Sequence, residues 1–144
     1  MIRPFLSTFA KNGDMATSKF RNWLAYQKGL ALAISIRNLC STFPTSERWK
    51  LTDQITRSSR SVCANLAEAY GRRAYLKHYQ AKLADCISEN YETQVWLDLA
   101  LAHNYLTEAH YAKYITASEE VGRLLSHMRN NPHQFTKAGT RSTK

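Results

Sequence analysis

The sequence has few residues that interrupt helices. Its 144 residues include only five glycines and three prolines. The prolines are Pro4, Pro44 and Pro132, and all three lie outside the stretches in which apolar residues recur with a helical period. Long runs of period 3.6 with so few breakers between them predict an all-α protein.

The sequence also lacks long apolar runs and paired cysteines. No stretch reaches the roughly 18 apolar residues of a membrane-spanning helix, and the basic first residues lack the apolar run of a secretory signal. The three cysteines, Cys40, Cys63 and Cys86, form no CxxC pair. An odd number of cysteines without such a framework indicates a reducing compartment. The sequence therefore predicts a cytoplasmic protein that does not interact with a membrane.

Motifs of catalysis and metal binding are absent as well. The chain has no nucleophile and base at motif spacing, no glycine-rich phosphate loop and no HExxH. Glu89 and Glu92 have the i, i+3 spacing of carboxylates in di-iron bundles, but those bundles need Glu-x-x-His on two helices, and none occurs here. The sequence therefore predicts a protein that is not an enzyme and that uses no metal and no cofactor.

Four amphipathic segments are present. We expect helices from about 20 to 40, from 51 to 70, from about 75 to 104, and from 107 to 130, with Thr107 as the N-cap of the last. Gly71 is expected to end the second helix in a left-handed conformation. Short connections between amphipathic helices predict an antiparallel up-down-up-down four-helix bundle. The bundle spans residues 20–131 in this prediction, between a flexible arm (1–19) and a basic disordered tail (132–144).

Charge is unevenly distributed along the chain. Residues 48–84 carry eight basic and two acidic side chains, whereas residues 85–120 carry seven acidic and one basic. With a turn centred near residue 72, Arg57 falls opposite Glu89 and Arg60 opposite Asp85. We therefore expect ion pairs between the second and third helices. The residues assigned to them are Arg57, Arg60, Asp85, Glu89 and Glu92.

Four stretches resemble a known family. They are Phe20-x-x-Trp23-x-Ala25-Tyr26-Gln27-Lys28-Gly29-x-x-Leu32, Phe43-Pro44-x-x-Glu47-x-x-x-Leu51-x-x-Gln54-Ile55-x-Arg57, Ser61-Val62-x-x-Asn65-Leu66-Ala67-Glu68-x-Tyr70-Gly71-Arg72 and Glu89-x-x-Glu92-Thr93-x-x-Trp96-Leu97. Their order and spacing resemble the four-helix-bundle proteins encoded in intervening sequences of bacterial 23S rRNA genes. The resemblance implies a bundle that often assembles as a ring-like homopentamer. It also implies kinship with the nucleic-acid-binding accessory protein of diversity-generating retroelements, which works with a reverse transcriptase.

The net charge of +9 makes nucleic acid the first candidate ligand. Basic residues gather around the turn between the second and third helices, where Tyr70, Tyr75 and Tyr79 are interleaved with them. An exposed tyrosine can stack on a base, but the same tyrosines could instead pack inward at a solvated helix end. The predicted nucleic-acid-binding residues are Arg72, Arg73, Lys77 and Lys82, with a second basic strip of Lys19, Arg21 and Lys28.

Two classes of function follow from the sequence. The first is an oligomeric accessory factor that binds nucleic acid, most simply RNA, with a reverse transcriptase as a conceivable protein partner. The alternative is a structural or protein-interaction module that has no nucleic-acid ligand.

Overall fold

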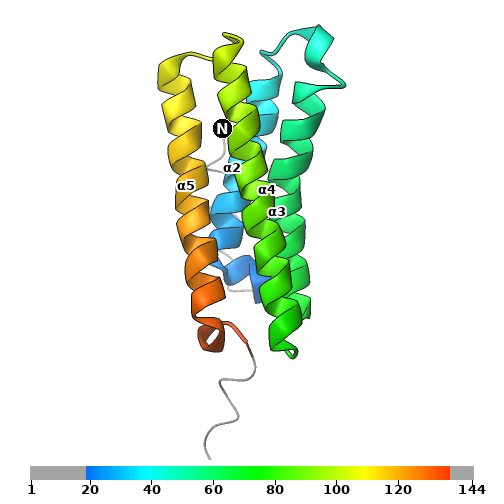
Figure 1. The fold of residues 1–144 in the computed structure, drawn as a ribbon, viewed down its shortest axis with the longest axis vertical. Coiled ribbons are helices and arrows are strands. Elements are labelled where there is room, and N and C mark those ends of the chain that lie inside the picture. Colours follow the sequence, from blue (N-terminus) through cyan, green and yellow to red (C-terminus); the bar gives the residue numbers. More distant parts are fainter. Residues whose placement is uncertain (1–18, 137–144) are drawn as a thin grey trace, which may run out of the picture.

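The computed structural model describes residues 19–136 and consists of helices (Figure 1). Four long α-helices follow one another along the chain: α2 (Leu24–Cys40), α3 (Leu51–Gly71), α4 (Leu76–Ala102) and α5 (Glu108–Asn130). Three short 3-10 helices accompany them: η2 (Lys19–Asn22), η3 (Thr45–Glu47) and η4 (Pro132–Gln134). With no strand between residues 19 and 136, the predicted all-α class is confirmed. The predicted arm, apart from Lys19, and residues 137–144 of the predicted tail lie outside the described residues.

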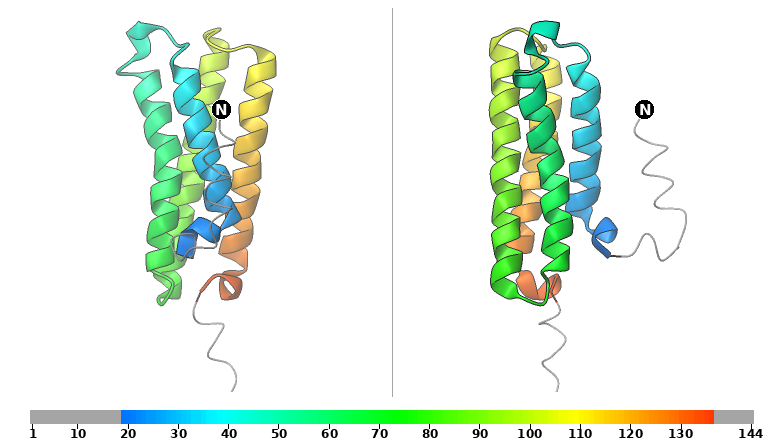
Figure 2. Two further views of the ribbon diagram at one scale, coloured as in Figure 1. Left: turned by 180° about the vertical axis from the view of Figure 1, so that it is seen from behind. Right: turned by 90° about the vertical axis from the view of Figure 1, so that its right-hand side faces the viewer.

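The four helices lie side by side, and consecutive helices run in opposite directions (Figures 1 and 2). The most extensive contact joins α3 to α4, and further contacts join α4 to α5, α2 to α3 and α2 to α5. The helices α2 and α4 therefore lie on opposite sides of the bundle. We call the end with η2, the α3–α4 turn and η4 the hairpin end, and the end with η3 and residues 103–107 the loop end.

The core forms from one apolar stripe of each helix. In α2 this stripe consists of Leu32, Ile36 and Leu39, which are at most 8% exposed. Ile55 of α3, like Leu83 and Leu97 of α4 and Leu125 of α5, is completely buried. Each such side chain contributes about 1.5–3 kcal/mol relative to an exposed position.

A layer of polar side chains crosses the middle of this core. The hydroxyls of Ser58 and Thr93 lie 2.8 Å apart, which joins α3 to α4. Asn90 of α4 donates to the carbonyl oxygen of Ser118 on α5 and accepts from the hydroxyl of the same residue. A Cβ at Gly122 would lie 3.3 Å from the Asn90 Nδ2, so this glycine gives the amide its room. Because a displaced buried amide would lose its partners, the layer holds the helices in one register.

The helix ends only partly match the prediction. Thr107 accepts a hydrogen bond from the backbone N–H of His110, which confirms it as the N-cap of α5. At the end of α4, Asn104 adopts a φ of 60°, and Tyr105 N–H donates to the Ala100 carbonyl over 2.8 Å. This pattern is a Schellman motif with asparagine in the left-handed position. The left-handed cap predicted at Gly71 was wrong, because Gly71 is the last residue of α3 and its φ is not positive.

The packed region continues beyond the predicted end of the bundle. The ring of Phe135 lies 6.2 Å from the ring of Trp23, and Thr136 is buried. Residues 132–136 therefore fold back onto the hairpin end and do not belong to a disordered tail. The apolar ring of Phe135 supplies the physical reason, since it completes an aromatic cluster that one turn of 3-10 helix places within reach.

Candidate nucleic-acid interface

The α3–α4 turn forms the tip of the hairpin end. Arg72 N–H donates to the carbonyls of Glu68 and Ala69, and Tyr75 N–H donates to the carbonyl of Arg72 over 2.9 Å. These bonds close the turn within Arg72–Tyr75, immediately before α4 begins at Leu76. The side chain of Arg72 is exposed there.

Arg73 is held against the bundle. Its guanidinium carbon lies 3.4 Å from the centre of the Tyr70 ring, and its Nε donates to the Tyr70 carbonyl over 2.9 Å. A cation over an aromatic face is stabilised by the ring quadrupole. Arg73 is half-buried in this position, so it offers less of its charge to a ligand than Arg72 does.

Only one of the three interleaved tyrosines faces solvent. Tyr70 packs on Trp23 with ring centres 5.4 Å apart. Tyr79 is fully buried, its hydroxyl donates to the Met128 carbonyl, and burial raises its pKa. Tyr75 is 66% exposed and lies beside the ring of His78. Tyr75 is therefore the tyrosine of this group that can stack on a base.

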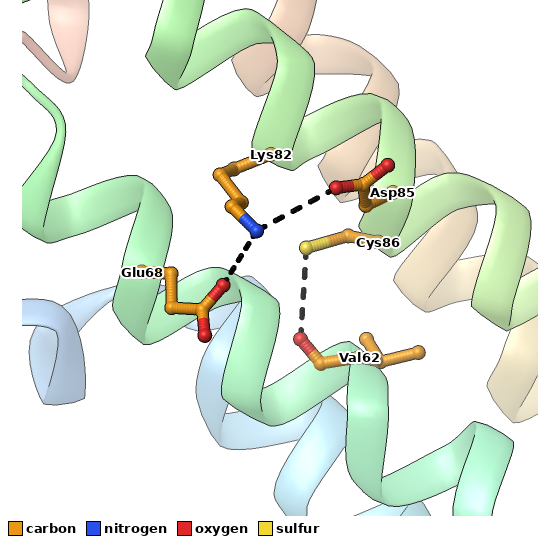
Figure 3. A network of polar contacts seen from close by, with 5 residues as sticks. All are labelled: Val62, Glu68, Lys82, Asp85 and Cys86. Atoms are coloured by element: carbon orange, nitrogen blue, oxygen red, sulfur yellow. Dashed lines mark hydrogen bonds and ion pairs between the residues drawn. The ribbon is translucent and has the colours of Figure 1, made fainter.

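The two predicted lysines of this region differ. Lys77 is exposed in the first turn of α4. The Lys82 ammonium lies 2.7 Å from a Glu68 carboxylate oxygen and 3.7 Å from one of Asp85, as Figure 3 shows. The hydrogen bond to Glu68 raises the pKa of Lys82. Lys82 thus already has carboxylate partners on α3 and α4, and its assignment to a nucleic-acid site stays a prediction.

The second predicted strip is divided by the fold. Lys19 and Arg21 lie at the hairpin end, where the Arg21 guanidinium covers the ring of Phe20 at 4.6 Å. Lys28 lies further along α2 and forms an ion pair with Glu120 of α5 over 2.9 Å. Lys28 therefore links two helices and does not belong with the other two cations.

The structure adds cations that the sequence interpretation missed. Because Tyr79 bonds to Met128, the last turns of α5 lie level with the first turns of α4. This places the exposed side chains of Arg123 and Arg129 at or near the hairpin end. The antiparallel topology with a helix stop at Pro132 could have predicted this, since it puts the end of the fourth helix beside the hairpin turn.

The hairpin end thus collects positive charge from three separate segments. Residues 19–28, 70–84 and 121–136 contain no aspartate and no glutamate. Outside the paired Lys28 and Lys82, their cations are Lys19, Arg21, Arg72, Arg73, Lys77, Arg123 and Arg129. We call these seven residues the basic patch.

The predicted ion pairs of Arg57 and Arg60 are not formed. Within residues 19–136 neither arginine has a carboxylate within 4.0 Å, and Asp85 pairs with Lys82. The turn has the expected length but is centred further along the chain than predicted, between α3 ending at Gly71 and α4 beginning at Leu76, so that Ser58 meets Thr93. This shifts the helices by about one turn and moves the arginines off their expected partners.

The carboxylates of α4 instead lie near one another. Desolvation raises the pKa of Glu89, and the neighbouring charges of Glu92 and Asp85 raise it further, while Arg57 lowers it. The indole Nε1 of Trp96 donates to the carboxylate of Glu92 over 3.2 Å. Glu89 and Glu92 therefore remain without a cation within ion-pair distance in the part of the chain that the structure describes.

The described residues contain neither a metal cluster nor a membrane-spanning helix. No group of three histidine, cysteine or acidic side chains between residues 19 and 136 could hold a metal ion. Over the same range no helix has the length and apolar character that a crossing of the bilayer requires.

These features define an all-α four-helix-bundle protein with a basic patch at one end. The chain belongs to the 23S rRNA-intervening sequence protein family, whose profile matches residues 21–127. A similar solved structure is that of a protein of unknown function of the S23 ribosomal protein family from Bacteroides thetaiotaomicron. The two share 28% identity with a TM-score of 0.68, over 74% of this chain and 96% of the other. A search of curated proteins gives no match.

The predicted family is thereby confirmed. The kinship with the accessory protein of diversity-generating retroelements is tested by none of these comparisons and stays a prediction.

Proposed function

We propose that this chain is a cytoplasmic, non-enzymatic protein that binds nucleic acid, with RNA as its first ligand, through the basic patch. The observation that carries the proposal is the convergence of cations from η2, the α3–α4 turn and α5 on one end of the bundle, in segments without carboxylates. Neutralising phosphates with such cations releases counterions from the nucleic acid.

The arrangement suits single-stranded RNA in particular. Arg72 and Lys77 are exposed and flank the exposed Tyr75 in the sequence. Cations that follow the backbone together with an aromatic ring that stacks on a base are the common features of single-strand binding surfaces. His78 beside Tyr75 widens the same surface.

Self-association is the second part of the proposal. A ring-like homopentamer, which the family resemblance implies, would present five basic patches on one particle. Linked sites that engage one strand together bind far more tightly than one site alone. A reverse transcriptase is a conceivable protein partner of such a complex.

The direct test reverses charge at the tip of the patch. The double variant Arg72→Glu, Lys77→Glu is compared with wild type by fluorescence anisotropy on a labelled single-stranded RNA at 50 to 200 mM KCl. We expect its affinity to fall by at least about 100-fold, because two phosphate contacts become repulsive. The matched control is Arg48→Glu, Lys50→Glu, which changes two exposed cations of the loop end.

Equal affinity of the tip variant and wild type would overturn the proposal, and so would equal losses in both variants. Circular dichroism of each variant checks that the helices are intact. The same titration on single-stranded and double-stranded DNA then shows whether RNA is preferred.

A protein-interaction module without a nucleic-acid ligand is the second candidate. The exposed apolar side chains of α4, Tyr91, Val95 and Leu99, favour it, since large exposed apolar residues in a row mark contact surfaces. Purified protein whose absorbance ratio and particle mass do not change on nuclease treatment, and which shifts no RNA at low salt, would support this candidate.

A further inference from the structure

The outer face of α4 is unusually apolar for a helix face that points to solvent. Tyr91 is 62% exposed, Val95 50% and Leu99 38%. Steps of three, four or seven residues join them to smaller side chains on the same face, a spacing typical of a helix that packs against another helix. The small residues of this face are Ala81, Ser88 and Ala102.

The outer faces of the neighbouring helices are different. On α3 the exposed side chains include Arg57, Arg60 and Glu68, and on α5 they include Glu119 and Arg123. Charges therefore cover the two flanking helices, and the exposed charges of α4 between Ala81 and Ala102 are Asp85, which pairs with Lys82 on the border with α3, and Asp98, on the border with α5. An uncharged stripe between charged borders has the anatomy of an interface core and its rim.

A second apolar outer face lies on the opposite side of the bundle, on α2. Leu24 is 50% exposed, and Leu30 and Ile34 are only partly covered and do not pack against the core cluster. Residues 19–43 contain four cations and no acidic residue. The outer face of α2 thus combines apolar side chains with the uncharged Gln27 and Asn38. Its border charges are Arg37 and Lys28, the latter paired with Glu120 of α5. The helix α4 instead carries carboxylates beside its face, at Asp85, Glu89, Glu92 and Asp98.

We infer that the outer face of α4 on one copy of this chain packs against the outer face of α2 on a second copy. The inference rests on the proposed self-association and names its contact. Opposite charges at the borders favour this pairing over α4 against α4, which would bring the same acidic borders together. Because the contact joins two different faces, each copy can use its α4 face toward one neighbour and its α2 face toward the other. Such a head-to-tail contact can close into a ring.

The directions of α2 and α4, and the positions of their residues along the bundle axis, are compatible with the inferred contact between α4 and α2. Because α2 and α4 run in the same direction, two bundles placed side by side with parallel axes bring α4 of one alongside α2 of the other (Figures 1 and 2). Within one bundle, a Cβ at Gly29 would lie 3.6 Å from the Val62 side chain, and the Val62 carbonyl accepts a hydrogen bond from Cys86, so these residues lie at about one level. Five residues further along both helices, Tyr91 comes level with Ile34.

Photo-crosslinking from position 91 tests the contact directly. Tyr91 is replaced by p-benzoylphenylalanine, which keeps an aromatic ring at this exposed position, and the full chain is irradiated and the crosslinked peptides are identified by mass spectrometry. We expect crosslinks between copies that end within residues 24–38, centred on Ile34. Crosslinks to residues 84–102 of another copy, crosslinks to residues 1–18, or no crosslink between copies would each overturn the inference.

The mass of the particle provides the second readout. Val95→Glu buries an unpaired charge if the contact forms, and we expect the dissociation constant of the assembly to rise by at least about 100-fold. Thr116→Glu, which adds the same charge to the exposed outer side of α5, is the matched control and should keep the wild-type mass in sedimentation velocity. A Val95→Glu variant with unchanged mass would contradict the inference.

The two proposals fail separately. If Val95→Glu is a monomer that binds RNA with reduced affinity, both proposals stand. If wild type is already a monomer at micromolar concentration but binds RNA through Arg72 and Lys77, the inferred contact is refuted and the nucleic-acid proposal survives.

Discussion

The two ends of the bundle are built from the same residue types and use them differently. At the hairpin end Tyr70 and Phe135 both pack on Trp23, and within residues 19–136 the arginines around them have no carboxylate within ion-pair distance. At the loop end the carboxylate of Glu47 accepts hydrogen bonds from Leu51 N–H and from the hydroxyl of Tyr105. Charge thus helps to close the fold at the loop end, whereas aromatic packing closes it at the hairpin end.

The tryptophans of the two ends give the largest expected contrast. Trp23→Ala removes the ring that touches Tyr70, Tyr79 and Phe135, and we expect it to lower the free energy of unfolding by about 3 kcal/mol. Trp49→Ala at the loop end changes a side chain that is 77% exposed, so a change within about 0.5 kcal/mol is expected. Urea denaturation followed by circular dichroism measures both. Equal losses would show that the aromatic cluster does not hold the hairpin end together.

The two ends of α5 give the next contrast, in binding. Arg129 lies in its last turn at the hairpin end, and Lys113 lies exposed in its loop-end half. If Arg129 contacts a phosphate, Arg129→Gln should reduce the slope of log K against log salt by about 0.7–0.9 and weaken RNA binding several-fold at low salt. Lys113→Gln should leave the slope unchanged. A slope that falls equally in both variants would mean that net charge, and not the basic patch, governs binding.

Alanine substitutions at the ends of α4 and α3 are expected to change the free energy of unfolding by smaller amounts and with opposite signs. Asn104 has a φ of 60°, where alanine is strained, so Asn104→Ala should destabilise the protein by about 1 kcal/mol. Gly71 is helical, and a Cβ there would meet nothing within 4 Å. Gly71→Ala should therefore stabilise by roughly 0.5–1 kcal/mol, through a less flexible unfolded chain. Thermal unfolding of the two variants checks the signs, and a destabilising Gly71→Ala would contradict the helical assignment of Gly71.

The sequence was sufficient for those features that depend on local chemistry. The four helices and the N-cap at Thr107 follow from period and capping preferences, which act within one element. The register of α3 against α4 depends on how the two helices pack. The neighbours of Arg57 and Arg60 on α4 could therefore not be predicted from the local sequence. For the same reason Lys82 was assigned to a ligand, although the packed helices place Glu68 beside it.

The basic patch was predicted only in part, also for a reason of packing. Contiguous cations such as Arg72, Arg73 and Lys77 are visible in the sequence, whereas Arg129 joins them only through the antiparallel path of α5. Phe135 was missed because a single aromatic residue after a proline has no periodic signal. Its role depends on packing against Trp23, which is distant in the sequence.

The smallest expected effect concerns pH and the loop end. Hydrogen bonds from Leu51 N–H and Tyr105 lower the pKa of Glu47 below the ordinary value of 4.5. The charged carboxylate is favoured by folding, so its stabilising contribution is complete above pH 4.5 and is lost as the pH falls through the lowered pKa of the folded state. Glu47→Gln keeps an acceptor oxygen but cannot ionise. Its melting temperature should therefore lie below that of wild type at neutral pH and converge with it on acidification.

Tyr105→Phe sharpens this comparison, because it removes one of the two hydrogen bonds that favour the charged form of Glu47 and leaves the Leu51 N–H in place. Its pH dependence should lie between those of wild type and Glu47→Gln. Arg72→Gln at the hairpin end serves as the control. Since Arg72 has no carboxylate within ion-pair distance in the described residues, its melting curve should run parallel to that of wild type through the acid range. A Glu47→Gln curve that also stays parallel would mean that Glu47 does not close the loop end by its charge, and the contrast between the two ends would then rest on aromatic packing alone.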